Sequence, residues 1–169
     1  MDRMAKPILN LDSLHYVPWG KGDTFEAKLG QIGTKLGAQK LGYSLIVVPP
    51  GKRAFPFHSH RTNEEMFLIL EGSGELRIGD DVHPVRKGDV IACAPGGPET
   101  AHQIANTGTV ELKYLGVSTM VYPEVAEYPD SGKYAAFHAL PPDAQGNPQR
   151  LRLITKRQST MDDYWDGEV

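Results

Sequence analysis

The sequence has little of several features that would point to common classes of protein. Among its 169 residues it has one cysteine, Cys93, and therefore cannot form an internal disulfide. No uncharged apolar run approaches the roughly 20 residues that a membrane-spanning helix needs. With 18 Lys and Arg against 21 Asp and Glu, the net charge is -3, which leaves no basic surplus to hold a polyanion. We therefore expect neither a nucleic-acid nor a membrane partner.

The start of the chain also lacks the apolar run of a signal peptide, since residues 1–14 carry several charges. Together with the single cysteine, this predicts a reducing, cytoplasmic location. A hydrophobic content of 40% and a charged content of 23% are typical of a folded globular protein. The length fits one domain of ordinary size.

Helical periodicity is absent before Tyr134, and short apolar runs separated by turn residues take its place from Leu41 onward. The runs expected to form strands are 43–48, 66–70, 76–78, 90–93 and 110–117. Gly79-Asp80-Asp81 is typical of a hairpin turn, which indicates antiparallel neighbours. These patterns predict an all-β sandwich or small barrel.

We expect three parts along the chain. Residues 1–40 form an N-terminal arm that packs on the barrel or on a partner subunit, 41–122 form the barrel, and 123–169 form a wrapping C-terminal tail. In the tail, apolar and basic residues alternate between Arg150 and Thr155, which is compatible with one more edge strand.

The run 65–70 is apolar on both alternate faces, whereas a strand with one face in water shows polar residues at every second place. Its outer face must therefore be covered. The arm, the tail or a second subunit could cover it, and we expect a homodimer. Trp19 and Trp165 are expected to pack an arm against the sheet or against a partner chain.

Four residues have the character of metal ligands. His58 and His60 are two residues apart, so in a strand both imidazoles project from one face. Glu65 follows after a short polar turn, and His102 begins another apolar run. Such a set suits Fe, Mn, Ni, Co, Cu or Zn, and it leaves open positions where substrate can coordinate. The alternative is that the histidine pair is a surface accident and that Glu65 only caps a strand.

In their order along the chain, these ligands and the nearby glycines and prolines resemble the two motifs of the cupin superfamily. The first motif is matched by Gly51, His58, His60, Glu65 and Gly72, and the second by Gly88, Pro95, Gly97, His102 and Asn106. The spacers before His58, Pro95 and His102 are longer than is usual in the family.

The resemblance covers roughly residues 41–121 and implies a double-stranded β-helix, or jelly-roll, barrel with a metal inside. It implies one divalent transition metal held by His58, His60, Glu65 and His102. Two stretches outside the barrel, 128–133 and 164–168, are similar to a bacterial single-domain subgroup that is labelled sugar-phosphate isomerase.

Strand alternation extends the candidate site to a substrate pocket. If Glu65 points at the metal, Phe67 and Ile69 point inward as well, and His102 brings Ile104 to its face. We add Tyr114, from the inward apolar stripe, and Tyr43, a candidate pocket hydroxyl.

The strand 110–117 has two readings. A hairpin through Thr107-Gly108 would place Lys113 opposite His102 and Glu111 opposite Ile104, which would put an acid and a base at the metal. If the stripe of Leu112 and Tyr114 turns inward, Glu111 and Lys113 face water instead. We favour the second reading.

Three functions fit this set. The first is a metal-dependent enzyme that acts on a small polar, sugar-like or carbonyl compound, for example an isomerase or epimerase. Lys52, Arg53 and Arg61 would then hold a phosphate, or they form only a solvated rim. The second is an Fe(II)-dependent dioxygenase, and the third is a metal-assisted binding protein or sensor without catalysis.

Overall fold

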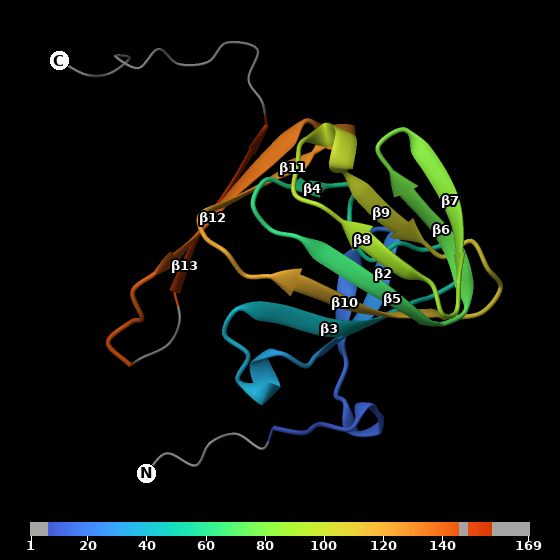
Figure 1. The fold of residues 1–169 in the computed structure, drawn as a ribbon, viewed down its shortest axis with the longest axis horizontal. Helices are drawn as coiled ribbons and strands as arrows, with labels where there is room; N and C mark the ends of the chain where they lie inside the picture. Colours follow the sequence, from blue (N-terminus) through green and yellow to red (C-terminus); the bar gives the residue numbers. More distant parts are fainter. Residues whose placement is uncertain (1–6, 146–148, 157–169) are drawn as a thin grey trace.

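The computed structural model describes residues 7–145 and 149–156 (Figure 1), and in this part of the chain it has thirteen β-strands and four 3-10 helices of three residues. The strands are β1 (Val17–Lys21), β2 (Phe25–Gln31), β3 (Leu41–Val48), β4 (Ser59–His60), β5 (Glu65–Glu71), β6 (Ser73–Ile78), β7 (Asp81–Arg86), β8 (Val90–Cys93), β9 (His102–Ala105), β10 (Leu112–Thr119), β11 (Glu124–Tyr128), β12 (Lys133–Leu140) and β13 (Gln149–Lys156). The helices are η1 (Leu11–Ser13), η2 (Thr34–Leu36), η3 (Pro98–Thr100) and η4 (Pro129–Ser131). The all-β prediction is confirmed.

The strands form three antiparallel sheets. One sheet has the order β1-β2-β3-β10-β5-β8, the second has the order β13-β12-β11-β4, and the third has the order β7-β6-β9. The expected hairpin at Gly79 is present, because Ile78 at the end of β6 pairs with Asp81 at the start of β7. No helix in the described residues has the length and apolar character needed to cross a bilayer.

The two readings of the strand after Thr107-Gly108 are resolved by its pairing. β9 pairs with β6, whereas β10 pairs with β3 and β5, so the hairpin that would bring Lys113 to His102 is wrong. The side chain of Asn106 explains the difference. Its Nδ2 donates to the carbonyl oxygens of Val48 and Val110 at 2.8 Å each, and its Oδ1 accepts from the Gly108 amide at 2.9 Å. These bonds direct the chain to β3 instead of back along β9.

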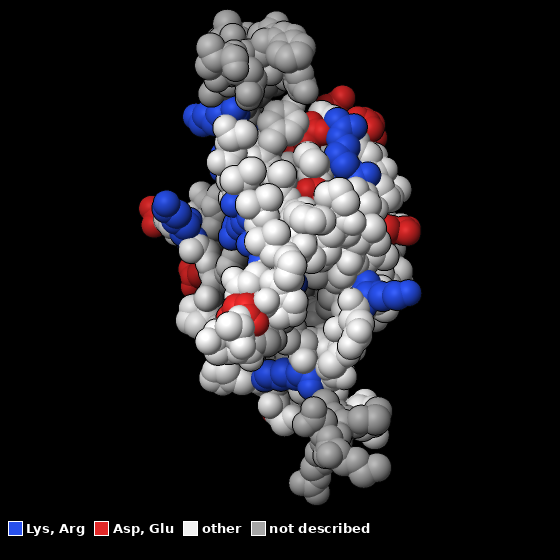
Figure 2. Space-filling model, turned by 90° about the vertical axis from the view of Figure 1, so that its left-hand side faces the viewer, with Lys and Arg blue, Asp and Glu red and all other residues white. Residues whose placement is uncertain are grey.

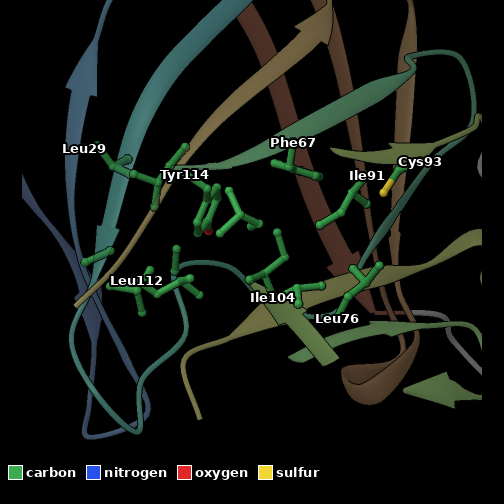
Figure 3. Close-up of a cluster of buried hydrophobic side chains, with 14 residues drawn as sticks. Leu29, Phe67, Leu76, Ile91, Cys93, Ile104, Leu112 and Tyr114 are labelled. Atoms are coloured by element: carbon green, nitrogen blue, oxygen red, sulfur yellow. The ribbon is translucent and has the colours of Figure 1, made fainter. Parts of the chain in front are cut away.

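The hydrophobic core lies on the inner face of the six-stranded sheet and extends to β6 and β9 (Figure 3). Leu112 and Tyr114 are fully buried in it, as the favoured reading predicts. Lys113, the residue between them, points the other way and pairs with Glu71 at 2.9 Å. Glu111 pairs with Lys28 at 3.2 Å. The acid and the base are therefore surface ion pairs, away from the histidines.

The outer face of β3, β5 and β10 is covered by residues from the beginning of the chain. Leu14 and Ile32 pack with Leu45 in a second buried cluster, to which Leu70 and Leu115 contribute. β1 and β2 lie within the segment expected to be an arm, and β2 pairs with β3. The Nε1 of Trp19 donates to the Ala54 carbonyl at 2.9 Å, so this indole packs an early strand onto the barrel. Trp165 lies outside the described residues.

The described part of the tail is largely strand. β11 pairs with β4 of the barrel, β12 pairs with β11, and β13 lies at the edge, as the alternation around Arg150 predicts. β12 and β13 project from the barrel on the side away from β6 and β7 (Figure 1). Figure 2 shows the face on this side, where the coloured basic groups stand at several separate places and do not form one patch.

Candidate metal centre

Three short strands bring the predicted ligands together. His58 precedes β4, and its backbone exchanges two hydrogen bonds with His102, at the start of β9, at 3.2 and 2.8 Å. His60 lies in β4, and Glu65 begins β5 after the turn 61–64. Residues that are far apart in the sequence therefore meet because β4, β5 and β9 converge at one end of the barrel.

One carboxylate oxygen stands at the centre of the group. The Oε2 of Glu65 lies 3.0 Å from the Nε2 of His102, 3.5 Å from that of His60 and 3.8 Å from that of His58. Two ligands bound at right angles to one ion at about 2.1 Å are about 3.0 Å apart, and a tetrahedral arrangement separates them by about 3.4 Å. The observed separations fit a shared transition-metal ion.

The four residues are not equally close. Ligand atoms of His58, His60 and Glu65 all lie within 4.8 Å of one another. His102 joins this trio through Glu65, since its ring centroid lies 4.9 Å from that of His58 but 6.5 Å from that of His60. The other three histidines are exposed and lie away from this group: His15 in the N-terminal segment, His83 in β7 and His138 in β12.

Two of the three imidazoles, those of His58 and His102, have a carbonyl acceptor behind Nδ1, which directs Nε2 to the centre. The Nδ1 of His58 lies 2.8 Å from the Pro56 carbonyl oxygen, and that of His102 lies 3.3 Å from the Thr100 carbonyl oxygen. The Nδ1 of His60 lies 3.7 Å from Glu124 Oε1, too far for a hydrogen bond. Protonation at Nδ1 leaves the Nε2 lone pair free for a metal, the arrangement that orients histidine ligands in proteins. In the hydrogen bond to Glu65 the Nε2 of His102 carries the proton instead, so a cation would replace that hydrogen bond.

The electrostatics favour an ionised carboxylate and a neutral imidazole. Burial alone would raise the pKa of Glu65, but hydrogen bonds from His102 and His60 outweigh it and hold the pKa well below its ordinary value. Burial and the neighbouring His102 lower the pKa of His58 to about 4. For His60, burial opposes protonation, but the nearby carboxylates of Glu65 and Glu124 outweigh it and raise the pKa. These are the protonation states in which a carboxylate and His58 can bind a cation.

Glu124 of β11 supports the site from behind. Its carboxylate accepts hydrogen bonds from the backbone amides of Arg61 at 3.0 Å and Asn63 at 2.8 Å, so it holds the turn between His60 and Glu65. Tyr128 lies four residues after Glu124 and therefore on the same face of β11. Its ring stacks on the His58 ring with centroids 6.0 Å apart. The sequence reasoning missed both residues, because nothing local to residues 122–128 marks them as neighbours of the histidines.

A cavity of about 420 Å³ leads to the centre, and Glu65 and Phe67 line it. Of the predicted pocket residues, Phe67 is therefore at this cavity. Tyr43 lines it as well, although its side chain packs with the outer cluster. Ile104 and Tyr114 instead line a gap of about 10 Å³ beside His58 and His102, and Ile69 is buried in the core.

The three cations expected at the rim are engaged elsewhere. Lys52 donates to the Asp23 carbonyl, and Arg61 forms an ion pair with the buried Glu127. Arg53 lines a different cavity, next to Arg77. None of the three lines the cavity at Glu65. What remains at the centre is a candidate ligand set, one member of which, Glu65, lines a cavity large enough for a small molecule.

Comparison with known proteins supports the fold and the motifs. The family model for the Cupin domain matches residues 44–118. An uncharacterized protein of Methanocaldococcus jannaschii is 40% identical over 76 residues, so the match spans 45% of this chain and 58% of that protein's length.

Two solved structures resemble the chain over a greater length. A protein of Acidithiobacillus ferrooxidans, assigned as a sugar phosphate isomerase, is 26% identical with a TM-score of 0.61, over 75% of this chain and 76% of that one. A cupin-superfamily sugar phosphate isomerase of Silicibacter pomeroyi is 23% identical with a TM-score of 0.73, over 94% of this chain and 98% of that one, a likeness of fold. The matched segment, the two motifs and the sheets that carry them agree with one another: residues 44–118, 75 of the 169 residues of the chain, match the family model for the Cupin domain.

Proposed function

We propose that the protein is a metal-dependent enzyme that isomerises or epimerises a small, sugar-like polar molecule. His58, His60, Glu65 and His102 hold one divalent transition metal, which supplies a Lewis acid for a carbonyl or hydroxyl oxygen of the substrate. The observation that carries the proposal is the single Glu65 oxygen that lies within 3.8 Å of three imidazole Nε2 atoms, at a cavity wall.

The donor set and its surroundings fit such an ion. Three neutral imidazoles and one carboxylate are borderline ligands, which suit Fe, Mn, Ni, Co, Cu or Zn. The buried Nδ1 of His60 has no hydrogen-bond partner but faces Glu124 at 3.7 Å, and a small rotation of the ring on binding a cation would bring the two into contact.

The cavity lining fits a polyhydroxylated substrate. Beside Glu65 and the apolar Phe67 it presents hydroxyl and amide side chains, which can donate to and accept from sugar hydroxyl groups: Gln31, Thr34, Gln39, Ser44 and Ser118. Of the described lining residues, Glu65 alone has a carboxylate, so a proton shift on the substrate would depend on water or on a hydroxyl group such as that of Tyr43. The likeness to the two sugar phosphate isomerases agrees with this substrate class.

Two alternatives use the same centre. An Fe(II)-dependent dioxygenase would need the same ligands with positions open to substrate and oxygen together. A non-catalytic binding protein or sensor would need the metal and the cavity but no group for proton transfer, which agrees with the scarcity of ionisable groups in the described lining.

The test begins with elemental analysis of the purified protein, followed by turnover assays with and without oxygen. We expect about one transition-metal ion per chain and aldose–ketose or epimer exchange that a chelator abolishes. The variant His58→Ala should stay folded and lose the metal, whereas the control His83→Ala, an exposed histidine of β7, should keep it. A full metal complement in His58→Ala would refute the ligand set. Iron with oxygen uptake would favour the oxygenase, and tight ligand binding without turnover would favour the sensor.

The proposal includes the setting of this enzyme. We infer that the working unit is a cytoplasmic homodimer, in which a barrel of residues 41–122 is framed by an arm, 1–40, and a tail, 123–169. The single cysteine agrees with a reducing compartment. The exposed apolar side chains of β13 agree with a partner chain.

A further inference from the structure

The cavity at Glu65 has one cationic side chain in its lining, and this residue comes from the tail. Of the described residues, Arg150 of β13 is the one Lys or Arg that lines it. At the inner side, Glu65 is surrounded by imidazoles, whereas Arg150 lies over Tyr122, and Leu41 and Met120 at the ends of β3 and β10 line the same cavity. A molecule in the cavity therefore meets the metal ligands and a guanidinium in the same space.

Strand register places Arg150 on the face that looks toward the metal centre. Glu124 pairs with Phe137 across β11 and β12, and Phe137 pairs with Arg152 across β12 and β13. Paired residues of neighbouring strands share a face, and residues two apart in a strand do so as well. Arg150 thus shares its face with Glu124, which lies behind His60.

The charge of Arg150 is available to a ligand. It has no ion pair within residues 7–145 and 149–156, and its guanidinium lies over the Tyr122 ring at 5.8 Å from the centroid. The aromatic face leaves the edge of the guanidinium, with its N–H donors, free. The separate basic groups on this side of the molecule (Figure 2) and the net charge of -3 mean that no general basic field would attract an anion here.

From these contacts we propose that Arg150 binds an oxyanion of the substrate, a carboxylate or a phosphate, at the outer end of the cavity. This proposal rests on the proposed function and narrows its substrate class to small polar molecules with an anionic group at one end and oxygen atoms for the metal at the other. The planar guanidinium fork matches both kinds of oxyanion and binds either with two parallel hydrogen bonds. Tyr122 is a positioning residue that holds the fork at the opening.

A cavity of about 420 Å³ limits the size of this ligand. It is near the lower end of the range for small-molecule sites, roughly 300–1,000 Å³, and fits a molecule of the size of a sugar phosphate or a short dicarboxylate.

The test is calorimetric titration of the purified full chain with inorganic phosphate, malonate, ribose 5-phosphate and uncharged ribose. We expect the anionic probes to bind more tightly than ribose, and Arg150→Gln to weaken their binding by about tenfold or more. The matched control is Arg152→Gln, an arginine of the same strand and face that lies over Phe137 at 5.9 Å and is absent from the cavity lining. It should bind within about twofold of wild type.

Two further readouts separate the outcomes. Preference for phosphate-bearing probes over malonate identifies a phosphate, and the reverse identifies a carboxylate; either supports the site. Equal losses in Arg150→Gln and Arg152→Gln, or no preference for anions in wild type, would overturn it. Metal content is measured in every sample, so that a metal-free wild type would count against the proposed function alone, while loss of anion preference with the metal present would count against Arg150 alone.

Discussion

The protonation state of Glu65 depends on its neighbours more than on its own burial. Hydrogen bonds from His102 and His60 lower its pKa although the side chain is largely removed from water. A carboxylate that accepts from several imidazoles is poised to exchange these hydrogen bonds for bonds to a cation. The same residues therefore bind one another through hydrogen bonds and would form the proposed ligand set if a cation replaced those bonds.

Glu124 is the residue on which we expect this geometry to depend most, apart from the ligands. Glu124→Gln removes the charge behind His60 and weakens the bonds to the amides of Arg61 and Asn63, so we expect the affinity for the metal to fall by about 10- to 100-fold. Metal competition with a chromogenic chelator measures this change. Glu127→Gln is the control, because Glu127 is a buried acid of the same strand that pairs with Arg61 and not with a histidine. Wild-type affinity in Glu124→Gln would contradict this role.

Cys93 gives a pH-dependent prediction. Burial, with the charge of Glu65 beside it, raises the pKa of its thiol from 9.0 to about 12. The unfolded thiol therefore ionises before the folded one as the pH rises, so its contribution to the free energy of unfolding is complete below about pH 9 and is lost toward pH 12. We expect wild type to lose more stability than Cys93→Ala between about pH 8 and pH 10.5 in urea titrations. A thiol that reacts with an aromatic disulfide reagent at pH 8 as fast as the unfolded chain does would contradict the raised pKa.

At the scale of elements, the turn between β5 and β6 fixes the strand that begins with Glu65. Gly72 has a φ of +80°, and a Cβ there would lie 2.5 Å from the Glu111 carbonyl oxygen. The backbone of Glu111 is held by the start of β10, so it cannot move away easily. This glycine is therefore required for its conformation and for the close approach of two chain segments.

Gly72→Ala should be more destabilising than Gly51→Ala. Gly51 has a similar φ of +75°, but no atom lies within 4 Å of a Cβ built there. We expect Gly51→Ala to reduce the free energy of unfolding by about 1 kcal/mol, the conformational penalty alone, and Gly72→Ala by about 3 kcal/mol because of the added clash. Urea denaturation compares the two variants. Equal losses would mean that the turn relaxes without cost.

At the scale of the whole molecule, the outer face of the barrel sheet is covered by other residues of the chain, whereas one face of the tail sheet is exposed. The outer face of the barrel sheet is covered by the beginning of the same chain, through Leu14 and Ile32, so a partner chain is not needed there. The sheet of β11, β12 and β13 is not covered in the same way, since Leu151 and Leu153 are 41% and 57% exposed. Val125 shares their face, because it pairs with Ala136, and Ala136 pairs with Leu153.

This apolar face is where we expect a second copy of the chain to pack. Light scattering coupled to size exclusion should give twice the chain mass of 18.6 kDa for wild type. Leu153→Glu should shift the equilibrium toward the monomer, since it places a charge in an interface that excludes water. Val82→Glu, at a valine of β7 that is 58% exposed, is the control and should remain dimeric. A monomeric wild type at micromolar concentration would contradict the prediction.

The sequence by itself determined most strands of the barrel, the all-β class and the four candidate ligands, because these depend on local alternation, on turn residues and on the order of the two motifs that resemble those of cupins. His58 and His60 must share a face in any strand, and Gly79-Asp80-Asp81 makes a hairpin wherever it lies. The strands 17–21 and 25–31 lie instead in the segment expected to be an arm. Phe25, Ala27 and Leu29 do alternate with Glu26 and Lys28, so the signal for the second strand was present, whereas Pro18 and Gly20 interrupt the pattern of the first.

Only the tertiary structure decided which distant segments meet. Asn106 directs β10 to β3 through bonds to Val48, 58 residues away, and no pattern near Asn106 specifies that partner. In the same way Glu124, Tyr128 and Arg150 reach the site through pairings of the tail sheet with β4. Strand pairing between remote segments depends on the packing of the whole core. The residues that surround the candidate ligands can therefore be identified only from the folded sheets.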